Sequence, residues 1–266
     1  MANKSYPKGM EKLLQGAIDC TSDTLKVTLV PVAYTFSTAH EFLSDLGTTV
    51  GSDQELAGVS VTGGVLDADD PDFGAIASGS TLKAMVLYKD TGNASTSPLL
   101  LYIDMITGFP LATSGSGLSI PWDDGPKKIA RMGLPFYPLG AEKVFSGQIN
   151  FLTASLRVAL VPAAYVYSAA HEFLDDVGAL IGTPQALTSV SVANGVFDAA
   201  DAAFGSPASG STVGSAIMYV EGADATDSPL LMHITDVVGF PAGTTGGAFS
   251  LIWSNGAARI FSLASA

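Results

Sequence analysis

A His-Glu-Phe-Leu segment occurs twice in the sequence, beginning at His40 and at His171, and is the pattern closest to a known catalytic motif. Zinc proteases place two histidines one helical turn apart, with a glutamate between them as general base. Here the position of the second histidine holds Ser44 in one segment and Asp175 in the other, so the second zinc ligand is missing. The pattern therefore favours a short helix start, with His and Glu near the N-cap and Phe-Leu in the core.

An acidic run resembles a calcium-binding loop, because calcium takes six to eight oxygen ligands from clustered carboxylates and carbonyls. Its carboxylates are Asp67, Asp69, Asp70 and Asp72. The corresponding stretch further along the chain keeps only Asp198 and Asp201, and the glycine and distal glutamate of an EF-hand are absent. Asx-turns before the next strand explain these residues as well, so no metal site is assigned.

Other catalytic patterns are weaker still. Ser114 and Ser116 lie in a Gly/Ser-rich stretch between expected strands, and no Gly-x-Ser-x-Gly elbow or phosphate-binding glycine loop occurs in the right context. Glu41 and Asp45 could form an acid/base pair, but their i, i+4 spacing is ordinary for a solvated helix face. We therefore predict that the chain is not an enzyme, with no catalytic, cofactor-binding or metal-ligating residue and no cofactor.

Aromatic residues at strand positions could instead form a sugar-binding platform. Five of them recur as aromatics later in the chain: Tyr34, Phe36, Phe73, Tyr88 and Trp122. Aromatic residues at strand positions more often belong to the core, so the platform is the weaker interpretation.

Composition excludes some classes of partner. The net charge is −13, and the only basic residues after position 131 are Lys143, Arg157 and Arg259. Binding to nucleic acid or to an anionic membrane needs a basic surface, so neither partner is expected. Charged residues make up 14% of the chain, against about 25% in typical soluble domains. Either part of the surface is covered by other subunits, or it is a neutral surface of Ser, Thr and Gly.

Cys20 is the single cysteine, so the chain holds no internal disulfide. Its counterpart later in the chain is Phe151, which indicates a buried apolar position rather than a nucleophile. No apolar run approaches the length of a membrane span, and the first residues lack the apolar segment of a signal peptide.

The sequence is a tandem duplication in which matching segments are always 131 residues apart. Tyr6-Pro7 recurs as Tyr137-Pro138, and Trp122 recurs as Trp253. Ser-Pro-Leu-Leu and Gly-Phe-Pro segments also occur at matching positions. The period is too long for a solenoid, so we predict two β-rich repeats, residues 1–131 and 132–266, with a joint near residues 131–136.

Within each copy the patterns predict many short strands and one or two short helices. A helix is expected after Pro7, a strand over Leu25–Val30, and a short helix capped by Ser37. Further strands are expected near 59–65, 84–88 and 99–106. Asp124-Gly125 and Asn255-Gly256 are preferred hairpin turns, so a hairpin is expected to end each copy. The fold class is therefore mainly β, as two sandwich-like or barrel-like domains.

Several segments resemble a family of small proteins encoded among the structural genes of tailed bacteriophages. They begin at Tyr6, at Ser22, at Ala39, at Gly64 and at Tyr88. The resemblance covers each copy nearly end to end and transfers no catalytic residue. It implies a virion structural protein associated with the head or the tail. The second copy lacks the Tyr-Lys-Asp-Thr-Gly segment of the first.

The resemblance and the duplication together predict a capsid decoration or cement protein, located in the virion. Its expected partners are the major capsid protein or other virion proteins, with multimeric contacts through the lattice or through itself. The alternative is a tail or adsorption component that binds a glycan on the host surface.

Overall fold

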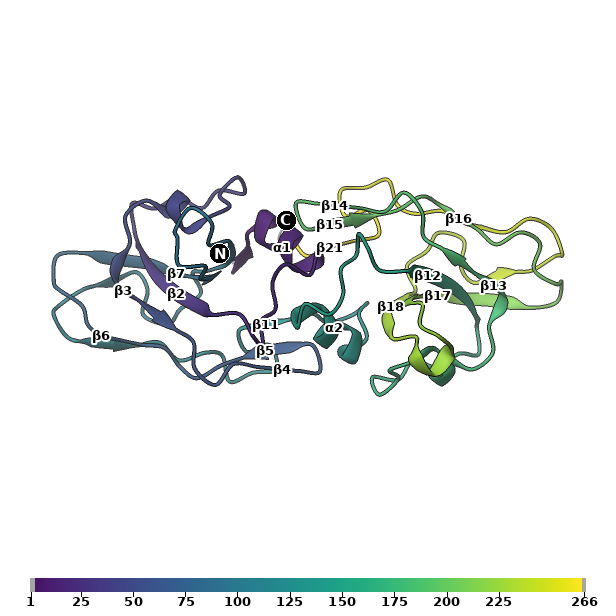
Figure 1. Ribbon diagram of the computed structural model, residues 1–266, viewed down its shortest axis with the longest axis horizontal. Coiled ribbons are helices and arrows are strands. Elements are labelled where there is room, and N and C mark those ends of the chain that lie inside the picture. Colours follow the sequence, from purple (N-terminus) through teal and green to yellow (C-terminus); the bar gives the residue numbers. More distant parts are fainter. Residues whose placement is uncertain (1–2, 265–266) are drawn as a thin grey trace.

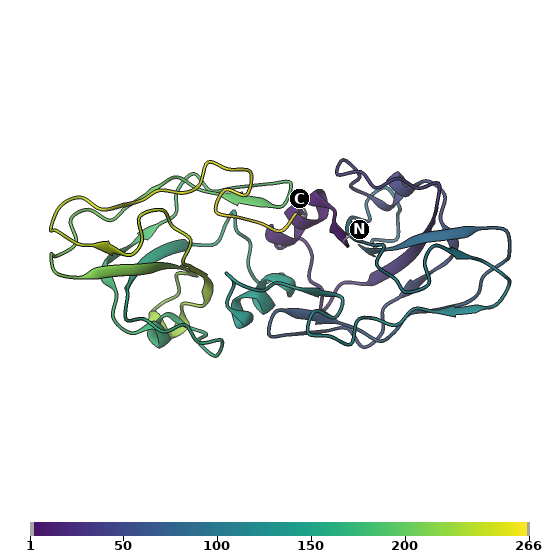
Figure 2. The ribbon, with the colours of Figure 1, turned by 180° about the vertical axis from the view of Figure 1, so that it is seen from behind.

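The structure is a computed structural model that describes residues 3–264. Two β-rich lobes occupy the ends of an elongated molecule, and the helices α1 (Pro7–Leu14) and α2 (Pro138–Phe145) lie between them (Figure 1). The view from behind has the same arrangement (Figure 2). The prediction of a mainly β fold in two tandem copies is confirmed.

The two copies contain corresponding elements. The strands of the first copy are β1 (Lys4–Ser5), β2 (Leu25–Pro31), β3 (Val50–Glu55), β4 (Ser60–Thr62), β5 (Val65–Asp67), β6 (Asp72–Ala75), β7 (Thr81–Lys89), β8 (Leu99–Ile103), β9 (Leu111–Ala112), β10 (Gly117–Ser119) and β11 (Ala130–Arg131). Those of the second copy are β12 (Leu156–Pro162), β13 (Ile181–Ala186), β14 (Ser191–Ala193), β15 (Val196–Asp198), β16 (Ala202–Ala203), β17 (Thr212–Val220), β18 (Leu230–Ile234), β19 (Ala242–Gly243), β20 (Ser250–Leu251) and β21 (Phe261–Ser262). Short 3₁₀ helices are η1 (Leu43–Leu46), η2 (Leu174–Val177) and η3 (Ala225–Asp227).

Each lobe is built on one antiparallel sheet. Its order is β1-β8-β7-β2-β3 in the first copy and β18-β17-β12-β13 in the second, with β9 and β19 paired to β7 and β17. The register is the same in both copies, since Leu29 pairs with Met85 and Leu160 pairs with Ala216. The predicted strand at Leu25 is confirmed as β2, whose alternating side chains suit a sheet.

Both faces of the main sheet are buried. On one face, Val27 and Leu87 belong to a large hydrophobic cluster that continues through the helices into the second copy. On the other face, Val30 and Tyr88 pack under the segment that follows β2. Burial of both faces explains why β7 is a nearly continuous apolar run.

The helices lie directly against the main sheets. Pro7 and Pro138 occupy the first helical turn, where proline lacks only an amide that would have no helical partner. A Cβ atom on Gly9 would lie 1.8 Å from the carbonyl oxygen of Leu99, and one on Gly140 would lie 2.3 Å from that of Leu230. The glycine two residues after each proline is therefore needed to bring the helix onto β8 or β18.

A β-hairpin from each copy reaches the helix of the other copy. The hairpin β4-β5 turns at Gly63-Gly64 and lies on α2, while β14-β15 turns at Asn194-Gly195 and lies on α1. All four turn residues have positive φ, as a type I′ turn requires. The Asn-Gly rule therefore applies to Asn194-Gly195, a turn that the sequence analysis did not identify.

The contacts between the copies are reciprocal. Glu142 Oε2 accepts the Gly63 N–H at 3.0 Å, and Glu11 Oε2 accepts the Asn194 N–H at 2.7 Å. These four residues form two pairs of equivalent positions, 131 residues apart. The backbone follows the same rule: the Cys20 N–H donates to the Phe145 carbonyl at 2.7 Å, and the Phe151 N–H donates to the Leu14 carbonyl at 2.9 Å.

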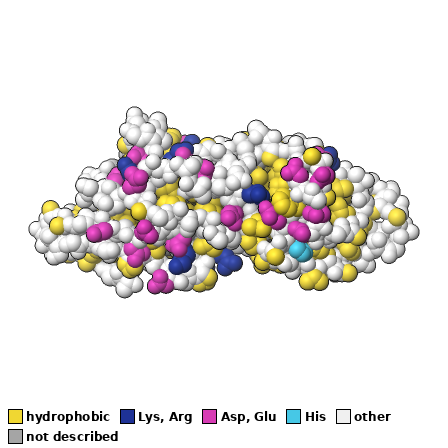
Figure 3. Space-filling view, turned by 60° about the horizontal axis from the view of Figure 1, so that its bottom comes forward, with side chains coloured by type: hydrophobic (Ala, Val, Ile, Leu, Met, Phe, Trp, Pro, Cys, Tyr) yellow, Lys and Arg dark blue, Asp and Glu magenta, His cyan; other side chains and the backbone are white. Residues whose placement is uncertain are grey.

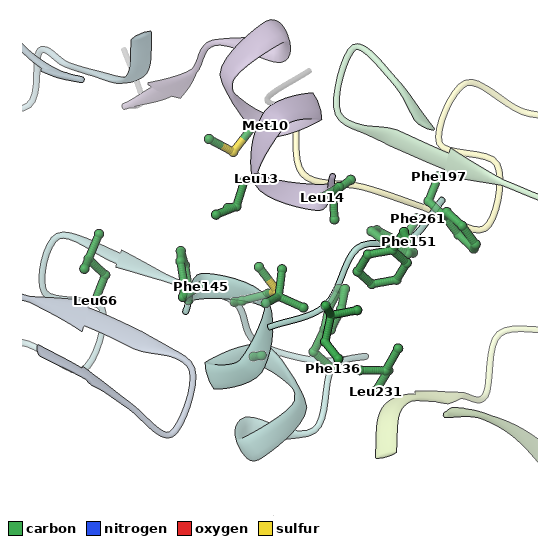
Figure 4. Packing of buried hydrophobic residues seen from close by; sticks show 14 of the residues in the cluster. Met10, Leu13, Leu14, Leu66, Phe136, Phe145, Phe151, Phe197, Leu231 and Phe261 are labelled. Carbon is green, nitrogen blue, oxygen red and sulfur yellow. The ribbon is translucent and has the colours of Figure 1, made fainter. Parts of the chain in front are cut away.

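Reciprocity of this kind defines an isologous interface, in which the same patch on each copy contacts the other. The two copies are thus related by an approximate two-fold axis that passes between α1 and α2. The side chains at this interface come from both helices and both hairpins (Figure 4). The molecule has the organisation of a symmetric dimer within one chain.

The two hairpins predicted at Asp124-Gly125 and at Asn255-Gly256 are wrong. The residues around Asp124-Gly125 form no hairpin, because β10 pairs with β6 while β11 pairs with β5. The loop between them joins two different sheets, and Asp123 Oδ1 instead accepts the Gly125 N–H at 3.1 Å. The Asn255-Gly256 loop likewise joins β20, paired with β16, to β21, paired with β15.

The prediction of a helix capped by Ser37 is also wrong. Ser37 closes a turn, because its Oγ accepts the Ala39 N–H at 3.2 Å and its carbonyl accepts the His40 N–H. The 3₁₀ helix η1 begins only at Leu43. A local side-chain hydrogen bond thus competes with helix formation at this serine.

Candidate functional site

The His-Glu-Phe-Leu segment serves the packing of the outer sheet face. His40 Nδ1 lies 2.8 Å from Tyr34 Oη, and this hydroxyl lies 2.8 Å from Tyr6 Oη. The second copy repeats this series of hydrogen bonds, and His171 Nδ1 lies 2.9 Å from Tyr165 Oη. Burial raises the pKa of the Tyr6 and Tyr34 hydroxyls, so these phenols remain neutral donors.

The two carboxylates of this segment are occupied by structural partners. Glu41 Oε1 pairs with Lys12 Nζ of α1 at 2.9 Å, so it ties the segment to the helix. Asp45 Oδ2 accepts the N–H groups of Phe42 at 2.9 Å and Glu41 at 2.8 Å. These backbone hydrogen bonds, that of Phe42 first, lower the pKa of Asp45. Both carboxylates therefore hold the segment in place.

The second copy repeats both interactions. Lys143 Nζ pairs with Glu172 Oε1 at 3.5 Å. Asp176 accepts the N–H groups of Phe173 and Glu172, and its pKa is lowered for the same reason. The retained motif is therefore explained by one retained structural role in each lobe.

The acidic run is hydrogen-bonded to the loop that carries Trp122. Asp70 Oδ1 accepts the Trp122 N–H at 2.8 Å, and the carbonyl of Asp69 accepts the indole N–H at 3.0 Å. In the second copy, Asp201 and Trp253 form the same bond at 2.9 Å. Asp67 lies 3.7 Å from Lys128. Within residues 3–264, no group of three or more His, Cys, Asp or Glu side chains could hold a metal ion.

The carboxylates that both copies retain are the ones with these partners. Asp198 lies 3.5 Å from Arg259, as Asp67 lies near Lys128. Asp72 differs between the copies, and its Oδ1 accepts only the nearby Gly74 N–H, at 2.9 Å. The duplication has therefore kept the two carboxylates with these partners and lost those of Asp69 and Asp72, whose counterparts are Ala200 and Ala203.

The serine-rich stretch is an exposed loop between β9 and β10. Ser114 Oγ and Ser116 Oγ lie 3.2 Å apart, and both residues are exposed. No histidine contact is found for either side chain within the described residues. The two hydroxyls therefore contact each other rather than a histidine.

The recurring aromatic residues are mostly in the core. Tyr34, Phe73, Tyr88 and Trp122 are each at most 9% exposed, and Phe36 is half-buried. They do not present flat faces to solvent, as a sugar-binding platform would require. Cys20 is also buried at 2% exposure, and burial raises the pKa of its thiol to about 12. The prediction of a buried apolar position for Cys20 and Phe151 is confirmed.

His233 is a feature of the second copy alone, because its counterpart in the first copy is Tyr102. Its Nε2 lies 2.8 Å from Ser215 Oγ, and its ring stacks on Tyr167 with centroids 5.6 Å apart. Burial lowers the pKa of His233. A neutral stacked imidazole with a hydroxyl partner is a packing element here.

The outer surfaces of the two lobes differ in their exposed hydrophobic residues. Val32 and Met105 are more than half exposed in the first copy, where the second copy has Ala163 and Asp236. In the second copy the exposed large hydrophobic residues are Leu134, Leu152, Val166, Val238 and Ile252. Figure 3 shows hydrophobic side chains at the surface near the middle of the molecule, with acidic side chains among them.

No family model, curated protein or solved structure matches this chain. Among residues 3–264, no helix has the length and apolar character needed to span a membrane.

Proposed function

We propose that the protein is a structural component of a tailed-phage virion, and most specifically a decoration or cement protein that binds the head lattice. The observation that carries this proposal is the organisation of the molecule. Two matching β lobes are fixed relative to each other by the reciprocal contacts of Glu11 and Glu142 with the opposite hairpins. The proposal also draws on the resemblance of each copy to phage structural proteins.

A rigid pair of similar lobes suits a repeating lattice. When one lobe is bound, the second binds as an intramolecular event, which raises avidity by about 10² to 10⁴ if both sites are within reach. The reciprocal interface holds the spacing between the lobes constant, so little orientational freedom is lost when the second lobe binds. Bivalent attachment of this kind links neighbouring capsid subunits.

The differences between the lobes fit binding to two similar but unequal environments. Val166 is 79% exposed in the second copy, and its counterpart in the first copy is Thr35. Apolar residues exposed in only one copy allow the two lobes to meet different neighbours on the particle. A low content of charged residues, 14% of the chain, is consistent with surfaces that become covered on assembly.

The experiment is to quantify the protein against the major capsid protein in purified virions by mass spectrometry with labelled peptide standards. Many copies per particle, in a multiple set by capsid symmetry, are expected. A count of only a few copies per virion would refute decoration of the head. Glycan-array binding together with such a low count would favour the tail or adsorption component instead.

A further inference from the structure

The chain contains two Asn-Gly dipeptides, Asn194-Gly195 and Asn255-Gly256. In such a pair the backbone nitrogen of the glycine can attack the side-chain carbonyl carbon of the asparagine, because glycine has no Cβ atom to obstruct the approach and its backbone rotates freely. The attack gives a cyclic imide and then an acidic residue. Its rate in a folded protein depends on how the reacting atoms are held, so the two dipeptides can be compared within one chain.

The loop that carries Asn255 is open to solvent and places a partner on each reacting group. Residues 254–259 are all exposed. The Gly256 N–H donates to Ser254 Oγ at 3.0 Å, and Arg259 Nη1 donates to Asn255 Oδ1 at 3.2 Å. The nitrogen that must lose a proton thus faces an acceptor, and the carbonyl oxygen that must become negative faces a cation.

Arg259 is held in this position by two further contacts. Its Nε lies 3.5 Å from Asp198 Oδ2 on β15, and its backbone N–H donates to the Gly256 carbonyl at 3.1 Å. A positive charge that is already in place where an oxyanion develops lowers the barrier to its formation. The guanidinium is therefore placed to stabilise the negative charge that develops on Asn255 Oδ1 when the Gly256 nitrogen attacks.

The other dipeptide, Asn194-Gly195, is held against this reaction. It forms the turn of the hairpin β14-β15. The Asn194 N–H donates to Glu11 Oε2 at 2.7 Å, the Gly195 carbonyl accepts the Leu263 N–H at 2.9 Å, and Gly195 is buried. Ring closure requires the backbone to rotate until the glycine nitrogen reaches the side-chain carbon of the asparagine, and these contacts oppose that rotation.

The first copy shows that the same loop accepts an acidic residue. Its equivalent dipeptide is Asp124-Gly125, and Asp123 Oδ1 accepts the Gly125 N–H at 3.1 Å. An aspartate at position 255 would therefore reproduce the residue that the first copy has at this point of the fold. The acidic product is compatible with the structure of the lobe.

We propose that Asn255 is a site of spontaneous deamidation, which adds one negative charge to the second copy beside Arg259. The Gly256 nitrogen forms a bond to Asn255 Cγ and passes its proton to water through Ser254 Oγ. The Cγ–Nδ2 bond breaks, and Nδ2 takes a proton from water and leaves as ammonia, which gives a succinimide ring. Water then opens the ring at either carbonyl and gives aspartate or isoaspartate. The site does not depend on attachment to a virion.

The test is incubation of the full chain at mildly alkaline pH, followed by proteolysis and mass spectrometry of the peptides that contain Asn194 and Asn255. The mass increase measures conversion of the amide to a carboxylate, and methylation by protein isoaspartate methyltransferase identifies isoaspartate. We expect Asn255 to react about tenfold faster than Asn194 in the folded protein, and the two rates to converge in denaturant. Equal rates in the folded protein, or an undiminished difference in denaturant, would overturn the proposal.

Two variants test the side chains that assist the reaction. Arg259→Ala removes the cation beside Asn255 Oδ1, and Ser254→Ala removes the acceptor of the Gly256 N–H. Each should slow deamidation of Asn255 several-fold, because each removes a group that contacts a reacting atom. Deamidation of Asn194 should stay unchanged in both, which separates assistance at the loop from a general effect on the fold.

A matched control is Arg157→Ala. Arg157 on β12 is also paired with a carboxylate, since its Nε lies 2.7 Å from Glu221 Oε1, and its loss should leave the rate at Asn255 unchanged. Ser254 and Arg259 are exposed, so their variants should fold, which circular dichroism checks. An unchanged rate at Asn255 in both folded variants would overturn the proposal of an assisted site. The comparison of the two dipeptides in the unaltered chain stays decisive if a variant fails to fold.

Discussion

Replacement of Gly64 by alanine should destabilise the contact between the two copies. Gly64 has φ of +74°, and a Cβ atom there would lie 2.7 Å from Ala141 Cβ on the helix of the other copy. The left-handed backbone costs an alanine about 1–2 kcal/mol. The overpacking adds about 1–3 kcal/mol, so the free energy of unfolding should fall by about 2–5 kcal/mol in total.

A matched control separates these two effects. Gly74 also has positive φ, +60°, but no atom lies within 4 Å of its Cβ position. Gly74→Ala should therefore lose only about 1–2 kcal/mol. Urea unfolding followed by circular dichroism measures both variants. Equal losses for Gly64→Ala and Gly74→Ala would refute the close approach between hairpin and helix.

A double-mutant cycle assigns the effect to the other copy. Ala141→Gly removes the methyl group that the new Cβ meets, although glycine inside a helix itself costs about 0.5–1 kcal/mol. The double variant Gly64→Ala with Ala141→Gly should recover about 1–3 kcal/mol relative to additivity. Strict additivity would show that the hairpin does not lie on α2 in solution.

Three further outcomes follow from single side chains. Cys20, buried with its pKa raised to about 12, should resist a thiol reagent at pH 8 in the folded protein and react at once in denaturant, as a colorimetric assay would record. Thr28→Ala should leave the free energy of unfolding unchanged or raise it, because the buried Thr28 hydroxyl has no hydrogen-bond partner among the described residues, and Ala159→Thr should lower it by about 1–3 kcal/mol. Asp45→Ala should cost about 0.5–2 kcal/mol at neutral pH, through loss of the hydrogen bonds that hold the start of η1. Because folding lowers the pKa of Asp45, this difference should be complete above the ordinary carboxyl pKa of about 4 and should disappear as the pH falls through the lowered value, which urea titrations at several pH values would measure.

Elements were predictable where a local sequence pattern alone indicates the structure. The alternation over Leu25–Val30 led to β2, and the proline before a run of helix formers led to α1. By contrast β3, with the polar sequence that follows Val50, has no hydrophobic alternation and was not predicted. This segment is a strand because its backbone pairs with β2, and its side-chain pattern does not indicate that pairing.

The turn rule identified the wrong loops because it is local. Asn194-Gly195 and Asn255-Gly256 satisfy the same dipeptide pattern, but only the first joins strands that pair with each other. The residues after Asn255 pair with β15 instead, across the lobe. Tertiary pairing therefore decides which of two equal signals becomes a hairpin.

Neither the reciprocal interface nor the cluster of phenylalanines in the second copy could be predicted from the aligned repeats. Glu11 and Glu142 occupy equivalent positions, and retention of both fits a contact within each copy as well as between copies. The sequence analysis noted only Phe151 among the four phenylalanines that replace smaller residues of the first copy, which are Phe136, Phe151, Phe197 and Phe261. Nothing in their spacing indicates that they meet around Phe261.

Covalent joining of the copies has a consequence for how substitutions act. In a dimer of identical chains, every substitution occurs twice, and a cavity opened on one side of the axis opens on the other as well. Loss of a large buried side chain costs about 2–5 kcal/mol at each occurrence, which would be doubled in a chain whose total stability is commonly 5–15 kcal/mol. Here Ala130 and Phe261 stand at equivalent positions, so the two halves vary independently and each substitution acts only once.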